Sequence, residues 1–218
     1  MKKLGVLSAV ALFAALSFVS CNKSSDGGGG GSNSNPSTIP NGQISGTIVN
    51  IPAGTPTTVT LVVIAGTTGN TYTTATAQVN GTNATFSATL PTPPANELMS
   101  ISVISDNVPQ VTISNPSAKI AIAYIEAGDP LNAEVVNVSN DNPISKQVVM
   151  LYVDSDVTVK GGATVAGVGG IIDLNLKKGW NWVLDASTTT SESITTGNIP
   201  SGMVWKLDLD LTFINSQF

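Results

Sequence analysis

Two stretches, Ile120-Ala121-Ile122-Ala123-Tyr124-Ile125 and Val148-Val149-Met150-Leu151-Tyr152-Val153, decide the fold. Neither alternates between apolar and polar side chains, as a strand with one solvated face does. A strand that is apolar on both faces lies inside a sheet, with other parts of the protein packed against each side. The sequence therefore predicts two central strands at these positions.

The chain around these stretches has the pattern of shorter strands. From Gly42 onward nearly every segment alternates with period two, and no window of a dozen residues shows a helical stripe. Proline and glycine interrupt the pattern at short intervals, as at Pro52, Gly66 and Gly81. This spacing is typical of antiparallel sandwiches. The predicted fold class is all-β, with two antiparallel β-sandwich (Ig-like) domains.

The boundary between these domains is predicted in a polar stretch that is broken by Pro109 and Pro116. The first domain would then be residues 42–105 and the second residues 117–218, joined by a linker at 106–116. Apolar residues in and beside the linker leave one alternative open, a strand that joins a single continuous sandwich: Val108, Val111 and Ile113.

Two hairpins are predicted from local turn signals. Asn80-Gly81 favours a two-residue type I′ turn, which pairs Ala77 with Ala84 and places one apolar face inward. That face consists of Ala75, Ala77, Val79, Ala84, Phe86, Ala88 and Leu90.

The second hairpin is predicted around a three-residue loop, Lys177-Lys178-Gly179. It sets Leu176 opposite Trp180 and Leu174 opposite Trp182. Its other face would be solvated and carries Asp173, Asn175 and Asn181. The C-terminal residues 203–213 alternate in the same way, with Trp205 on the buried face.

The first twenty residues have the features of an export signal. Lys2 and Lys3 precede an uncharged run from Leu4 to Val19, and Ser20-Cys21 follows. This run is shorter than the roughly 20 residues that span a bilayer, although a short membrane anchor is the alternative. Signal cleavage is expected between Ser20 and Cys21.

Phe18-Val19-Ser20-Cys21 resembles the lipobox of bacterial lipoproteins, with Phe18 in place of the usual leucine. The resemblance implies cleavage before Cys21 and acylation of its thiol, rather than redox or nucleophilic chemistry. One acyl chain binds a membrane only marginally, so the several chains of this family imply firm anchoring. Asn22 differs from the aspartate that retains such proteins in an inner membrane, which implies the outer membrane or the cell surface.

A second resemblance rests on the lipobox, the segment that follows it and one ten-residue stretch. Residues 21–41 are rich in glycine, serine and asparagine and are expected to form a flexible tether after the acylated cysteine. Together with the lipobox and the stretch Asp173-Leu-Asn-Leu-Lys-Lys-Gly-Trp-Asn-Trp, this tether resembles uncharacterised bacterial surface lipoproteins with immunoglobulin-like or transthyretin-like β-domains. The resemblance implies location and fold, and carries no catalytic residues.

Composition removes several classes of function. The 218 residues include one cysteine, no histidine and nine basic residues, all of them lysine, so no imidazole base or arginine phosphate clamp is present. Removing residues 1–20 leaves seven lysines against fourteen acids, a charge of −7, which argues against nucleic-acid binding. Because serine nucleophile motifs are also missing, no enzyme activity, catalytic residue or cofactor is predicted.

Three sets of residues remain as candidate sites. Asp154 and Asp156 follow a predicted central strand and are a weak candidate for calcium, the alternative being an acidic turn. Asp208 and Asp210 share one strand face and could act as an acid and base pair for glycosides, the alternative being a solvated face. The tryptophans could form a sugar-binding platform or belong to the core, and pairing favours the core: Trp180, Trp182 and Trp205.

These expectations combine into one functional hypothesis. The chain is predicted to be a membrane-anchored cell-envelope lipoprotein whose β-domains serve binding, adhesion or assembly without catalysis. Its expected partners are the membrane, through the N-terminal lipid, and a glycan or protein at the cell surface. The alternative is a carbohydrate-binding accessory module of a surface glycan-processing system, which would require exposed aromatic side chains.

Overall fold

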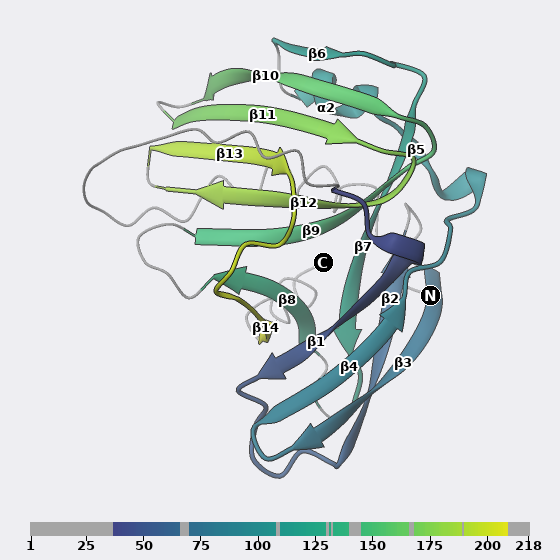
Figure 1. Cartoon of the computed structure of the whole chain (residues 1–218), viewed down its shortest axis with the longest axis vertical. Coiled ribbons are helices and arrows are strands. Elements are labelled where there is room, and N and C mark those ends of the chain that lie inside the picture. The colour runs from purple at the N-terminus through teal and green to yellow at the C-terminus, as the bar shows by residue number, and fades with distance from the viewer. Residues whose placement is uncertain are drawn as a thin grey trace, which may run out of the picture.

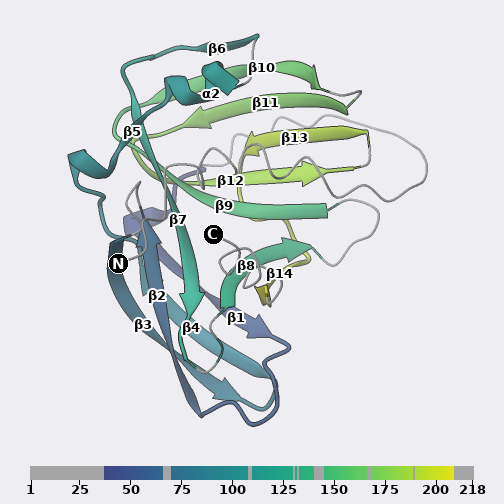
Figure 2. The ribbon, with the colours of Figure 1, turned by 180° about the vertical axis from the view of Figure 1, so that it is seen from behind.

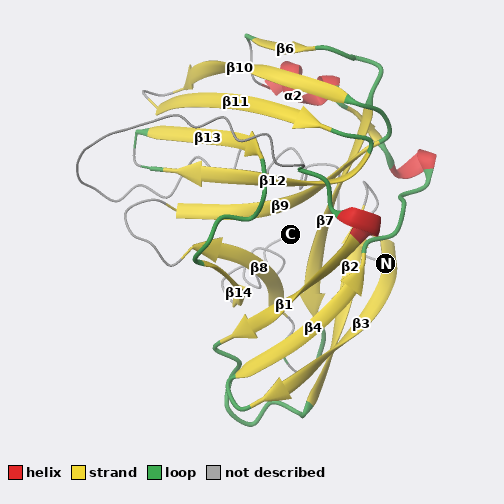
Figure 3. Ribbon diagram, in the orientation of Figure 1, coloured by secondary structure: helices red, strands yellow, loops and turns green. Residues whose placement is uncertain are grey.

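The computed structural model describes residues 37–65, 70–107, 110–129, 131, 133–139, 145–165, 168–188 and 190–208. The predicted all-β class is confirmed (Figure 3). The strands are β1 Gln43–Val49, β2 Thr58–Ala65, β3 Asn70–Asn80, β4 Asn83–Thr89, β5 Met99–Ser100, β6 Val111–Ile113, β7 Lys119–Ala127, β8 Ala133–Ser139, β9 Ser145–Val153, β10 Val157–Val165, β11 Val168–Leu176, β12 Gly179–Ser187, β13 Ser191–Thr196 and β14 Met203–Asp208. The helical elements are η1 Pro40–Gly42, η2 Ala95–Glu97 and α2 Ser102–Asn107.

Eight of these strands close into a barrel (Figure 1). Around the barrel the order is β2, β3, β4, β1, β14, β8, β9 and β7, and β7 pairs with β2 to complete the circle. An eight-stranded barrel has an interior just wide enough for side chains to fill, and here mainly aliphatic side chains fill it. The prediction of two separate antiparallel β-sandwich (Ig-like) domains is therefore wrong.

The remaining strands extend the sheet beyond the barrel. From β9 the order continues through β12, β13, β11 and β10 to β6, while the short β5 pairs with β7. Figure 2 shows helix α2 lying over one face of this extension. Ile101, just before the helix, and Ile104 within it are buried in a second apolar core with the strands beneath them.

Strands β7 and β9 are shared by the two cores, as the two apolar stretches predicted. Along β7, Ala121 and Ala123 face the barrel interior, whereas Ile120 and Ile122 face the second core. Strand β9 alternates in the same way, with Met150 and Tyr152 in the barrel core and Leu151 and Val153 in the second core. The prediction of central strands that are buried on both faces is confirmed.

The proposed domain boundary does not divide the sheet. Strand β2 pairs with β7, and β1 pairs with β14, so each predicted half supplies strands to the same barrel. The stretch predicted as the linker, 106–116, contains the end of α2 and strand β6, which pairs with β10. Val111 and Ile113 pack against the second core, which explains their apolar character, while Val108 lies outside the described residues.

The first predicted hairpin forms with a shifted register. Asn80 pairs with Asn83, so the two-residue loop is Gly81-Thr82, and Gly81 adopts a positive φ of 62°. Val79, and not Ala77, lies opposite Ala84. Because the shift moves each partner by two residues, the same side chains still share a face, and the predicted apolar face packs on the barrel core.

The second predicted hairpin does not exist, because β13 lies between β11 and β12. Leu174 and Leu176 face the second core, whereas Trp180 and Trp182 face the barrel core. Asn181, predicted on a solvated face, is completely buried. A strand that comes later in the chain inserts between two neighbours, and local turn rules carry no information about such an insertion.

The barrel closes where the first described strand meets the last. β1 and β14 form a parallel pair in which Ile48 lies opposite Trp205. The Trp205 ring meets Phe86 edge to face, with 5.3 Å between ring centroids. The predicted burial of the C-terminal strand is confirmed for Trp205, which is 7% exposed, whereas residues 209–213 of that prediction lie outside the described residues.

Gly46 is the residue that makes room for this indole, since a Cβ at that position would overlap the Trp205 ring. Gly46→Ala should destabilise the fold by about 1–3 kcal/mol, the usual cost of overpacking a core. Urea denaturation followed by tryptophan fluorescence would measure the loss. Gly197→Ala is the control, because a Cβ at that position would meet no atom within 4 Å. Equal stability of the two variants would contradict the role of Gly46.

Candidate functional site

The chain enters the folded body through a short segment, Ser37-Thr38-Ile39, which we call the strap. The strap forms an antiparallel bridge with β12 at Thr38 and Asn181. The Ile39 N–H donates to the Trp180 carbonyl at 2.8 Å, and the Trp182 N–H donates to the Ser37 carbonyl at 2.7 Å. Residues 37–41 were predicted as part of the tether, but the structure docks them on the body.

The strap occupies a gap in the extended sheet. Strand β13 separates β11 from β12 only as far as Thr196, which lies opposite Val183. Beyond that point the strap takes its place, since the Ser37 hydroxyl donates to the Asn175 carbonyl of β11 at 3.2 Å. The strap therefore lies inside the sheet, between β11 and β12.

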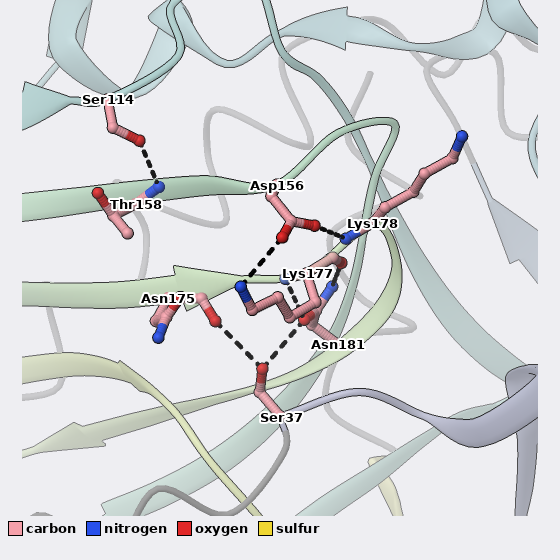
Figure 4. Close-up of polar contacts among 8 residues, drawn as sticks. All are labelled: Ser37, Ser114, Asp156, Thr158, Asn175, Lys177, Lys178 and Asn181. Carbon is pink, nitrogen blue, oxygen red and sulfur yellow. Dashed lines mark hydrogen bonds and ion pairs between the residues drawn. The ribbon is translucent and has the colours of Figure 1, made fainter.

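Asn181 connects the strap to the loop between β11 and β12 (Figure 4). Its Oδ1 accepts hydrogen bonds from the Ser37 hydroxyl and from the Lys177 N–H, both at 3.0 Å. Its Nδ2 donates to the carbonyls of Lys177 at 2.7 Å and Gly179 at 2.9 Å. One side chain with no exposed surface thus satisfies the loop backbone and holds the strap.

The calcium candidates Asp154 and Asp156 make different contacts. Asp156 accepts from the Lys178 N–H at 2.8 Å and pairs with the Lys177 ammonium at 3.0 Å (Figure 4). These contacts hold the pKa of its carboxyl below the ordinary value. Asp154 instead accepts from the Lys119 N–H at 2.9 Å. Both carboxylates are thus occupied by hydrogen bonds to backbone N–H groups of neighbouring segments. Within the described ranges, no three Asp, Glu, His or Cys residues are grouped to hold a metal.

The candidate acid pair and the predicted cleavage site lie partly or wholly outside the described residues. Asp208 lies opposite Glu134 on β8, while Asp210 lies outside the described residues, as do Ser20 and Cys21. Burial, with Asp208 and Glu126 nearby, raises the pKa of Glu134 to about 7. Asp208 thus belongs to a row of acids that crosses three strands.

The three tryptophans lie in or against the barrel core, as predicted, although the pairing with Leu174 and Leu176 behind that prediction is wrong. Trp180 is 5% exposed, donates its indole N–H to the Pro91 carbonyl at 2.8 Å and meets Tyr152 edge to face. Trp205 lies in the same core, and the partly buried Trp182 packs against it. Among the described side chains the one large exposed apolar residue is Ile171, so none of these indoles offers a platform for a sugar.

Two acids on neighbouring strands, the buried Asp185 and the half-buried Glu192, were not among the sequence candidates. Asp185 of β12 is 4% exposed and lies opposite Ile194 of β13, two residues from Glu192. Ile194 belongs to the second core, so alternation places both carboxylates on the face of the sheet that bears this core. Burial and the nearby Glu192 raise the pKa of Asp185 to about 7, and burial raises the pKa of Glu192.

Each acid of this pair has one buried oxygen without a hydrogen-bond partner: Asp185 Oδ1 and Glu192 Oε1. Glu192 also lines a groove of about 440 Å³ together with Gln110, Gly162, Gly169, Gly170, Ile171, Ser191 and Ser193. Such buried, unpartnered polar atoms are few in natural proteins and call for a ligand, a proton or a water to explain them.

The pair Asp185 and Glu192 was not predicted from the sequence, because the face of β12 that carries Asp185 was expected to be solvated. Alternation along β12 places Asp185 in phase with Asn181 and Val183, a face predicted to be solvated because the tryptophans occupy the other one. Both faces of β12 are in fact covered. The one indication in the sequence that this face is buried was Val183, an apolar residue on the face that was predicted to be solvent-exposed.

Comparison with known proteins returned no relatives: no family model, no curated protein and no solved structure matches the chain. No helix in the described part of the chain has the length and apolar character required to cross a bilayer.

Asn181→Ala should loosen the strap, because each buried polar group that loses its partner costs roughly 1–3 kcal/mol. Urea denaturation should show the lower stability, and amide hydrogen exchange should show faster exchange at Ile39 and Trp182. Asn175→Ala is the matched control, since Ser37 bonds to the backbone carbonyl of Asn175 and the side chain is exposed. Unchanged exchange at Ile39 in Asn181→Ala would contradict the role of Asn181.

The raised pKa of Asp185 predicts lower stability at neutral pH than at mildly acidic pH. Its ordinary value is 3.8 and its folded value is about 7, so between these values only the folded chain holds the proton. This contribution is present below the unfolded pKa and is lost as the pH rises through the folded pKa. The melting temperature, measured with a chelator present, should fall between about pH 5 and pH 8.

Asp185→Asn should reduce that fall, because an amide does not titrate. Glu134, whose pKa is also about 7, should account for part of the remaining slope. Asp173→Asn is the control, since Asp173 is exposed and pairs with Lys160 at the surface. A pH profile of Asp185→Asn that matches that of the wild type would refute the assignment.

Proposed function

We propose that the protein is a lipid-anchored scaffold of the cell envelope, attached to the membrane through Cys21 and serving binding, adhesion or assembly rather than catalysis. The strap is the observation that supports this proposal best. It joins the end of the expected tether to the interior of a sheet by two backbone hydrogen bonds and a buried asparagine. The strap fixes the point at which the N-terminal segment meets the folded body.

The body has the character of a rigid support. Two apolar cores share strands β7 and β9, so the barrel and the extended sheet pack as one unit. The barrel interior is filled by side chains, including Trp180 and Trp205. A filled barrel leaves its outer surfaces, and the groove beside Glu192, as places where a partner binds.

A non-catalytic role is supported by the residues of the chain. The sequence has no histidine, the side chain that most often acts as a general acid or base. The lysines at Lys160 and Lys177 pair with exposed aspartates at the surface. The alternative, a carbohydrate-binding accessory module, loses its main support because the tryptophans that it required lie in the core.

Replacement of the lipid-bearing residue tests the anchor. Cys21→Ala should move the protein from the membrane fraction to the soluble fraction, because an alanine cannot be acylated. Cell fractionation with immunoblotting would measure this, and mass spectrometry of the mature N-terminus would detect the acyl chains. Asn22→Ala is the control that keeps the cysteine. Retention of Cys21→Ala in the membrane fraction would contradict the proposal.

A further inference from the structure

Among the described residues, the buried Asp185 and the half-buried Glu192 have no positive group opposite them on their own face of the sheet. Strand β9 flanks β12, and its lysine, Lys146, lies opposite Ala186 and therefore points to the other face. On the other side of β12, the partner of Asp185 on β13 is Ile194, and Glu192 lies opposite Gly170 of β11. Within the described part of the chain, no lysine lies on this face beside the pair.

Further oxygen and amide groups surround the two acids. Gln147 of β9 lies directly opposite Asp185, and Ser187 of β12 lies directly opposite Glu192. Side chains of directly opposite residues share a face, with their Cβ atoms about 4.5–5.5 Å apart. Two carboxylates, one amide carbonyl and one hydroxyl are thus gathered on three adjacent strands.

The two orphaned oxygens point to a ligand. Asp185 is 96% buried, since 4% of its surface is exposed, yet its Oδ1 accepts no hydrogen bond, and the same holds for the buried Oε1 of Glu192. A buried carboxylate is costly unless it is protonated, paired or bound to a metal. A small hard cation would bind the two unpartnered oxygens and neutralise the negative charges of the two carboxylates.

We propose that Asp185 and Glu192, with Gln147 and Ser187, form a calcium-binding site at the end of the second core. Calcium takes six to eight oxygen ligands, and carboxylates bind it through one oxygen or two. The four side chains supply part of that number, and water supplies the rest. Glu192 is half-buried and also lines the groove of about 440 Å³.

The site differs from the pair suggested by the sequence pattern. Asp154 and Asp156 already accept hydrogen bonds from the backbone of Lys119 and Lys178, and Asp156 also pairs with a lysine ammonium. Asp185 and Glu192 each retain an unsatisfied oxygen. Substitution in the pair Asp185 and Glu192 should therefore weaken calcium binding, whereas substitution of Asp156 should not.

Calcium binding to the full chain, purified in detergent and freed of metal by a chelator, tests the proposal at pH 7.5. Calcium should raise the melting temperature in a concentration-dependent way, and isothermal titration calorimetry should show one site. The titration should extend to about 10 mM, because extracellular modules bind calcium with dissociation constants of up to about 10⁻³ M. No response over this range would overturn the proposal.

Asp185→Asn and Glu192→Gln should each weaken calcium binding about tenfold or more, since each removes a charged ligand. Both variants should remain folded without calcium, because they remove a buried charge, and circular dichroism would verify this. Asp156→Asn is the control and should retain the calcium response. A response that persists in Asp185→Asn, or one that Asp156→Asn abolishes, would overturn the assignment.

Discussion

The burial of β7 and β9 on both faces is the constraint on which the rest of the structure depends. Each strand sends alternate side chains into two different cores, so neither core is complete without both strands. In Figure 1, β7 runs from the extended sheet down to the barrel and links the two parts. An amphipathic strand could not do this, because its polar face would be buried in one core. The unbroken apolar stretches in β7 and β9 are therefore what makes a single body out of a barrel and an open sheet.

The strap binds at a gap in the sheet that extends from β9. Strand β13 ends early and leaves a gap between β11 and β12, where backbone groups of β12 would otherwise lack partners. Residues that precede the barrel fill this gap, and Asn181 completes the polar contacts that the short strap cannot make alone. A segment whose composition is that of a tether is thus ordered by hydrogen bonds with a distant part of the chain, and not by its own propensity.

Much of the pattern within individual strands could be predicted from the sequence, but little of the arrangement between strands. Alternation placed Phe86 and Trp205 on buried faces correctly, because the period of a strand is a local property. The pairing of Leu176 with Trp180 failed because β13, which comes later in the chain, separates their strands. The burial of Asp185 and Asn181 was not predicted for a related reason: the residues that cover this face of β12 come from distant segments of the chain. Strand partners and sheet coverage depend on non-local contacts that no single stretch of sequence encodes.

The parallel pairing of β1 with β14 also has a consequence for the order of folding. The first described strand finds its last neighbour only when the final described strand is available, so the contact spans almost the whole body. Contacts of such long sequence separation form slowly, because the loop entropy must be lost before the contact contributes. Until then, β1 has one unpaired edge, which is open to pairing with other chains. A chain exported from its N-terminus would complete its barrel only after its C-terminal strand had crossed the membrane, and would depend on protection of that edge in the interval.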